Sequence, residues 1–182
     1  MELQKIIQCN SVLFYNYYQL NNSVKYMLKY VNYDIVFQEF PDEVTLAINI
    51  SNCPCKCPGC HSLYLTNDIG SLLTIDKIDN LINQHKKTIT CIGLMGGDIN
   101  PTEINAIAKY IKQKYRTIKI GWYTGRTTIS RQIDIKFFNY IKVGPYIKHL
   151  GPINSKTTNQ KMYRVENESI LNDITNKFWK NN

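Results

Sequence analysis

The segment Cys53-Pro54-Cys55-Lys56-Cys57-Pro58-Gly59-Cys60-His61 places four cysteines within eight residues. Three of them, Cys53, Cys57 and Cys60, have the spacing C-x3-C-x2-C. The two prolines and the glycine keep the segment out of regular helix and strand, so a loop is predicted here. Thiolates that converge from such a loop are typical of a metal or iron–sulfur site. Disulfides are a poor alternative, because neighbours this close in sequence would close strained rings.

Three cysteines bind only three irons of a cubane cluster and leave the fourth iron open. The spacing resembles the signature of the radical S-adenosylmethionine (SAM) superfamily. The sequence from Cys57 to His61 resembles one of its families more closely, the activating proteins of anaerobic ribonucleoside-triphosphate reductases. The superfamily usually has an aromatic residue just before the last cysteine. Here Gly59 occupies that position and the ring follows the cysteine as His61, as in the activating proteins.

This resemblance implies an oxidoreductase with one 4Fe-4S cluster on Cys53, Cys57 and Cys60, and with SAM beside Gly59, Cys60 and His61. It implies reductive cleavage of SAM to a 5′-deoxyadenosyl radical, which creates a glycyl radical on the large subunit of the anaerobic reductase. The implied partners are that subunit and an electron donor such as flavodoxin or ferredoxin. The resemblance implies no catalytic residue beyond the cluster and SAM.

A second motif, Gly96-Gly97-Asp98, follows a strand predicted over residues 88–95. Two glycines let a backbone approach a ligand closely, and a carboxylate pairs with an ammonium group. Alone such a triplet usually indicates a turn. Here the triplet comes one strand–helix unit after the cysteine loop. In that place it resembles the glycine-rich SAM motif, usually Gly-Gly-Glu, which binds the methionine amino group. Gly96, Gly97 and Asp98 are therefore the expected SAM contacts.

Four further residues have two interpretations each. Tyr123 and Thr124 end a predicted strand, where they either contact the ribose or carboxylate of SAM or pack in the core. Asn159 and Gln160 either lie near the site or the partner, or belong to a surface loop. Cys91, inside a buried strand, is expected to fill the core.

Strands alternating with helices predict an α/β fold with a mostly parallel sheet. The family resemblance covers residues 27–165 and implies an open partial (β/α) barrel, with a single domain over residues 27–182. Residues 1–26, including Cys9 as a free thiol, are expected to be an N-terminal extension of uncertain role. The expected strands cover residues 34–40, 43–51, 88–95, 117–124 and 140–143, with a further strand ending near residue 165. The expected helices cover residues 74–87, 101–115 and 168–179.

Length, composition and charge limit the classes of protein to which this chain can belong. The chain has 182 residues, 43% of them hydrophobic, and a net charge of +8. No apolar run approaches the roughly 20 residues of a membrane span, and no signal-peptide pattern is present, so a cytoplasmic protein is expected. The lysines are scattered singly rather than grouped in a basic stripe, which makes nucleic acid an unlikely partner.

Two kinds of alternative remain open. Within the radical SAM superfamily, the chain could activate another glycyl-radical enzyme or act on a small substrate. In a different class, Cys55 could join the other three cysteines in a four-thiolate zinc site of a nucleic-acid-binding module. Structural zinc sites usually draw two separated ligand pairs, which disfavours that interpretation. Cys55 discriminates the two classes, because only the zinc site would need it.

Overall fold

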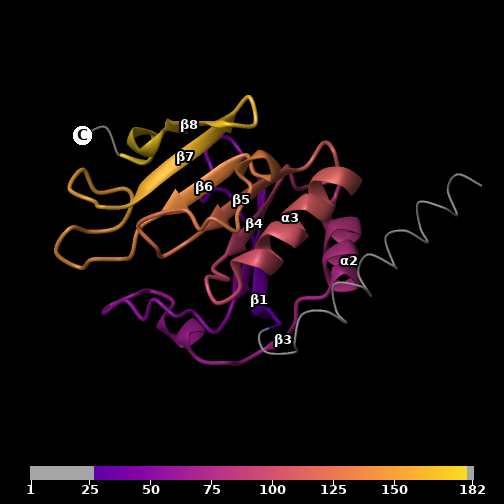
Figure 1. The fold of residues 1–182 in the computed structure, drawn as a ribbon, viewed down its shortest axis with the longest axis horizontal. Helices are drawn as coiled ribbons and strands as arrows, with labels where there is room; N and C mark the ends of the chain where they lie inside the picture. Colours follow the sequence, from indigo (N-terminus) through magenta and orange to yellow (C-terminus); the bar gives the residue numbers. More distant parts are fainter. Residues whose placement is uncertain (1–26, 180–182) are drawn as a thin grey trace, which may run out of the picture.

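A computed structural model describes residues 27–179. Within these residues eight strands form one sheet in the order β3-β1-β2-β4-β5-β6-β7-β8 (Figure 1). The strands are β1 (Lys29–Val36), β2 (Thr45–Ile50), β3 (Ser71–Leu72), β4 (Cys91–Met95), β5 (Lys119–Tyr123), β6 (Tyr140–Val143), β7 (Lys161–Glu166) and β8 (Ile170–Asp173). The predicted extension over residues 1–26 and its Cys9 lie outside the described residues.

The sheet is mixed, which corrects the expectation of a mostly parallel one. The central strands β2, β4, β5 and β6 pair in parallel through three ladders. The outer strands add four antiparallel ladders. For two of these ladders the reason is connection length, because a parallel pair needs a crossover of a dozen or more residues whereas a short loop reverses the chain. The short loops between β1 and β2 and between β7 and β8 therefore give antiparallel pairs.

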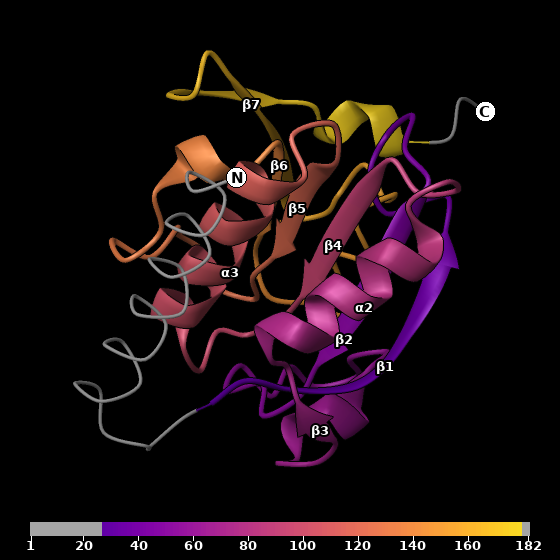
Figure 2. The ribbon, with the colours of Figure 1, turned by 90° about the vertical axis from the view of Figure 1, so that its right-hand side faces the viewer.

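Two helices, α2 (Ile75–His85) and α3 (Pro101–Lys114), lie together on one face of the sheet (Figure 2). Thr74 caps α2 by accepting a hydrogen bond from the Lys77 amide, and Asn100 caps α3 in the same way. Both helices turn their apolar side chains into the main core between helices and sheet. These two helices were predicted from the sequence, and the structure confirms them.

The opposite face of the sheet is organised around Phe40, which is fully buried. Gly93 and Gly121 lie opposite each other on β4 and β5. A Cβ built on Gly121 would lie only 2.0 Å from the Phe40 ring. The ring therefore occupies the space that two missing side chains leave. β1 covers Lys29–Val36, so the strand predicted over residues 34–40 is placed too late in the chain. Phe40 lies in the loop after β1 and fills the core on this face of the sheet. Cys91 is buried beside it, as expected of a core residue.

The terminal helix predicted over residues 168–179 is wrong. The chain instead turns at Asn167 and Glu168, both with positive φ (48° and 62°), and returns as β8 along β7. A short 3-10 helix, Thr175–Phe178, follows. Pairing with β7 gives the backbone of this segment hydrogen bonds and neighbours in the sheet. This stabilisation outweighs the preference for a helix that the spacing of the apolar residues indicates.

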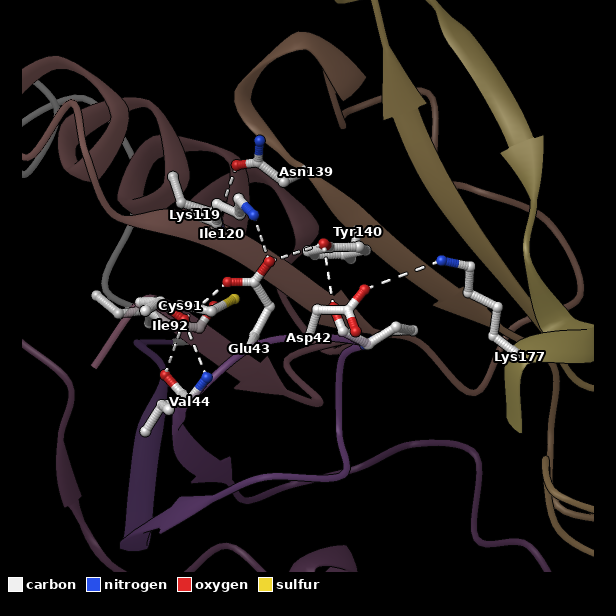
Figure 3. Close-up of polar contacts among 12 residues, drawn as sticks. Asp42, Glu43, Val44, Cys91, Ile92, Lys119, Ile120, Asn139, Tyr140 and Lys177 are labelled. Carbon is white, nitrogen blue, oxygen red and sulfur yellow. Dashed lines mark hydrogen bonds and ion pairs between the residues drawn. The ribbon is translucent and has the colours of Figure 1, made fainter. Parts of the chain in front are cut away.

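Glu43 lies in the loop before β2 (Figure 3). Its side chain is buried, with 4% exposed. Its carboxylate accepts hydrogen bonds from the hydroxyls of Thr90 (2.7 Å) and Tyr140 (2.9 Å) and forms an ion pair with Lys119. Burial and the Glu43 carboxylate raise the pKa of the Tyr140 phenol. The carboxylate thus joins the loop to β4, β5 and β6 at their amino ends.

We expect Glu43→Gln to lower the free energy of unfolding by about 1–3 kcal/mol, because an amide cannot accept from all three donors. Asp42→Asn is the matched control, since that side chain is 82% exposed and its ion pair with Lys177 is long, at 3.9 Å. The control should change stability by less than about 0.5 kcal/mol. Urea unfolding of the two variants measures both values, and equal losses would contradict the assignment.

Candidate functional site

The carboxyl ends of β2, β4, β5 and β6 meet at one edge of the sheet, because these strands are parallel. The loops that leave this edge are tied to one another. The Gly96 amide donates to the Tyr123 carbonyl (3.1 Å), and the Gly144 amide donates to the Arg126 carbonyl (2.7 Å). The cysteine segment is the loop that follows β2. The fold therefore brings the two predicted motifs to the same edge.

The last part of the cysteine loop is a tight turn. Pro58 and Gly59 are its central residues, and the Cys60 amide donates to the Cys57 carbonyl (3.1 Å). Gly59 has φ +75°, the value that the third residue of a type II turn requires. Such a turn holds its first and fourth Cα atoms within about 7 Å of each other. The spacing C-x2-C therefore brings the backbones of two cysteines close together.

The donor set fits an iron–sulfur cluster in its chemistry. Cys53, Cys57 and Cys60 are free thiols, partly exposed, on one short loop. In residues 27–179 no three His, Cys, Asp or Glu side chains converge closely enough to hold a metal ion. Cluster binding by these three cysteines therefore needs rotation of side chains, which a turn with exposed thiols permits. The assignment of the three ligands stays a prediction.

Cys55 has surroundings that the sequence did not reveal. Its Sγ lies 3.7 Å from Asp98 Oδ2. A Cβ on Gly125 would lie 2.7 Å from the same sulfur, so the loop after β5 covers this thiol. Burial first, and then the Asp98 carboxylate, raises the pKa of Cys55 to about 12. Cys55 therefore joins the cysteine loop to the glycine-rich motif.

Asp98 is a buried carboxylate, 4% exposed. One oxygen accepts from the Thr124 hydroxyl (2.5 Å) and the other from the Gly125 amide (2.8 Å). A carboxylate has about four acceptor positions, so these contacts leave capacity for a ligand ammonium. The predicted contact of Asp98 with SAM stays a prediction, and Thr124 acquires a structural role as the partner of Asp98.

The backbone conformation requires the two glycines before Asp98, and packing adds a second requirement at Gly97. Gly96 and Gly97 have φ of +109° and +87°. A Cβ on Gly97 would lie 2.4 Å from the Ile104 side chain of α3. The close approach of strand and helix therefore explains Gly97 without a ligand. The SAM contacts expected at Gly96 and Gly97 remain predictions.

The other predicted residues lie around this edge. His61 is exposed, with Nδ1 3.4 Å from the Ser62 hydroxyl. Asn159 and Gln160 donate side-chain hydrogen bonds to the carbonyls of Pro145 (2.9 Å) and Gly144 (3.3 Å). They hold the loop that follows β6, which places them beside the site.

Tyr123 turns to the face that Phe40 covers, and its hydroxyl donates to the Glu39 carbonyl (2.8 Å). Lys142 of β6 lies over the Tyr123 ring, with Nζ 4.5 Å from the ring centre. Burial lowers the pKa of Lys142, while Glu39 and Cys60 oppose that shift. Nothing in the sequence distinguishes Lys142, because one lysine within a strand carries no specific signal.

A pocket of about 310 Å³ opens at the same edge. Asp98 and Pro101 line it from the β4–α3 connection, and every second residue from Trp122 to Gln132 lines it from β5 and the loop that follows. In an extended chain alternate side chains point the same way. Thr124, Arg126, Thr128, Ser130 and Gln132 are all polar, so this alternation is a signal that the sequence alone contains.

In the part of the chain that the structure describes, no helix is long and apolar enough to cross a membrane. No curated protein and no solved structure matches the chain significantly. A family model described as a 4Fe-4S single cluster domain matches residues 44–172, which include the cysteine loop and the Gly-Gly-Asp motif. The match spans most of the chain, and the protein therefore belongs to the family of 4Fe-4S single cluster domains.

Proposed function

We propose that this iron–sulfur protein is a radical SAM activase that generates the glycyl radical of an anaerobic ribonucleoside-triphosphate reductase. One observation carries the proposal. The C-x3-C-x2-C loop after β2 and the Gly-Gly-Asp motif after β4 meet at one edge, where Cys55 touches Asp98. A cluster and SAM bound there would supply a 5′-deoxyadenosyl radical. We also propose that the parallel centre of the sheet corresponds to an open partial barrel.

The residues of this edge have separate roles in the proposal. Cys53, Cys57 and Cys60 hold the cluster, and Asp98 orients the ammonium of SAM. Gly59 keeps the turn between two ligands free of a side chain. Packing against α3 and the loop after β5 buries Gly97 and Asp98, and a buried site protects reactive intermediates.

A protein partner fits the surface beside the loop. Leu63 and Tyr64 follow the cysteines directly and are 52% and 42% exposed. Exposed apolar side chains beside a site are typical of interaction surfaces. The reductase large subunit would dock there, and a flavodoxin or ferredoxin would supply the electron. A cytoplasmic location is part of this proposal.

The test is anaerobic reconstitution of the full chain with iron and sulfide, followed by electron paramagnetic resonance of the reduced protein. We expect a cubane signal that changes when SAM is added, with release of methionine and 5′-deoxyadenosine. A glycyl radical signal should then appear on added reductase large subunit. A cluster that neither responds to SAM nor cleaves it would sink the proposal while leaving the family assignment intact.

The chemical alternatives give other outcomes of the same experiment. Cleavage of SAM without a radical on the reductase would favour another glycyl-radical partner or a small substrate. Uptake of zinc in place of iron would favour the zinc module. The contact of Cys55 with Asp98 supports the three-cysteine assignment, because it engages the thiol that a four-thiolate zinc site would use.

A further inference from the structure

Lys142 is a cation without an ion pair on the face of the sheet that Phe40 covers. It is partly buried on β6, and its Cα pairs with that of Tyr123 on β5. The ammonium lies over the Tyr123 ring, with Nζ 4.5 Å from the ring centre. None of the ion pairs in residues 27–179 involves Lys142. Burial of an unpaired charge costs free energy, so Lys142 is a candidate functional residue.

Strand geometry places Lys142 on the side of Phe40 that faces the cysteine loop. The Phe40 ring stacks on Tyr140, which precedes Lys142 by two residues on β6. Side chains two residues apart in a strand share a face of the sheet. Of the two residues, Lys142 is nearer to the carboxyl end of β6, the edge at which the cysteine loop leaves the sheet. Lys142 therefore lies one step closer to the site than the Phe40 ring.

The loop that follows β6 contacts the cysteine turn. Its Tyr146 ring would lie 3.7 Å from a Cβ built on Gly59, the residue before Cys60. Burial lowers the pKa of the Lys142 ammonium, while the charges of Glu39 and Cys60 oppose that shift. The ammonium of Lys142 and the sulfur of Cys60 are therefore close enough to interact electrostatically.

We propose that Lys142 raises the reduction potential of the cluster held by Cys53, Cys57 and Cys60. The proposal rests on the cluster of the proposed function and does not depend on SAM. Reduction takes one electron from the donor and breaks no bond, so it adds one negative charge beside the cysteine loop. A fixed cation nearby stabilises the reduced form more than the oxidised form, whereas the carboxylate of Glu39 acts in the opposite sense.

The test is a redox titration of the reconstituted full-length protein in the absence of SAM. Dithionite is the reductant, redox mediators are present, and electron paramagnetic resonance measures the reduced cluster. Lys142→Met removes the charge and keeps a long side chain. It should lower the equilibrium constant for reduction about tenfold, which is a shift of about 60 mV to more negative potential for a one-electron couple. This is the scale of a unit charge about 10 Å away at an effective dielectric constant of about 20.

Three further variants separate charge from packing. Lys142→Arg keeps the charge and should keep the wild-type potential. Glu39→Gln removes the opposing charge and should shift the potential to a more positive value. Lys112→Met is the matched control, because Lys112 lies in the last turn of α3, at the opposite end of the sheet from the cysteine loop. Its potential should equal that of wild type.

The outcomes separate this proposal from the proposed function. An unchanged potential in Lys142→Met would overturn it, as would equal shifts in Lys142→Met and Lys142→Arg, which would indicate packing alone. If Lys142→Met fails to fold or to hold iron, the sign of the shift in Glu39→Gln decides. A wild-type protein without a reducible cluster would overturn both proposals. Potentials that shift as stated on a cluster that does not cleave SAM would overturn the proposed function alone.

Discussion

Replacement of Cys57 by serine is expected to reduce the bound iron of the reconstituted protein to less than about a tenth of wild type. Cys57 is the middle cysteine of the three, and the turn from Cys57 to Cys60 supplies two of them. A serine hydroxyl is a poor substitute for a soft thiolate. Loss of an outer-shell partner already costs about 10- to 100-fold in metal affinity, and loss of a ligand itself should cost more. Iron and acid-labile sulfide analysis after desalting measures the effect.

The matched control is Cys55→Ser. Its hydroxyl can still donate to Asp98, and its smaller atom fits against Gly125. We expect full iron content, together with an unchanged paramagnetic signal of the reduced cluster. If Cys55→Ser loses as much iron as Cys57→Ser, the three-ligand assignment is wrong and Cys55 belongs to the metal site.

Local signals predicted the elements that position the site. Thr74 precedes an apolar stripe and marks the start of α2, and Pro101 marks the start of α3. Helix capping and the fixed φ of proline are local effects, so the sequence shows them directly. Strand β6 was placed correctly, and strands β2, β4 and β5 to within a few residues at each end. The cysteine segment could be predicted as a loop because its two prolines and one glycine disfavour both helix and strand.

Long-range pairing explains what the sequence did not reveal. The apolar spacing from Ile170 to Phe178 suits a helix, but β7 offers an edge that only the folded sheet contains. The buried position of the Phe40 ring depends on two glycines more than 50 residues away in the sequence. The contact of Cys55 with Asp98, and the pocket that Asp98 and Arg126 both line, likewise join segments that only the parallel ladders bring together.

The largest stability effect is expected from Phe40→Ala, at about 3–5 kcal/mol. The ring is fully buried, stacks on Tyr140 with ring centres 5.2 Å apart, and meets Tyr123 edge-on at 5.4 Å. Its removal opens a cavity against Gly93 and Gly121, which have no side chains of their own to fill it. Phe37→Ala is the control, because Phe37 belongs to the same loop and is 70% exposed. Urea unfolding should show a change within about 0.5 kcal/mol for Phe37→Ala.

A double-mutant cycle tests whether the glycine and the ring share one space. Gly121→Ala alone places a methyl group where the Phe40 ring lies, and overpacking should cost about 1–3 kcal/mol. In the Phe40→Ala background the same methyl group enters the cavity. The double variant should therefore be more stable than the sum of the single losses predicts, by about 0.5–3 kcal/mol, the range found for residues in contact. Additive losses would show that the ring and the glycine do not compete for this space. The site lies at the carboxyl ends of the two strands that the ring spans, so this packing fixes how β4 and β5 present Asp98 and Arg126.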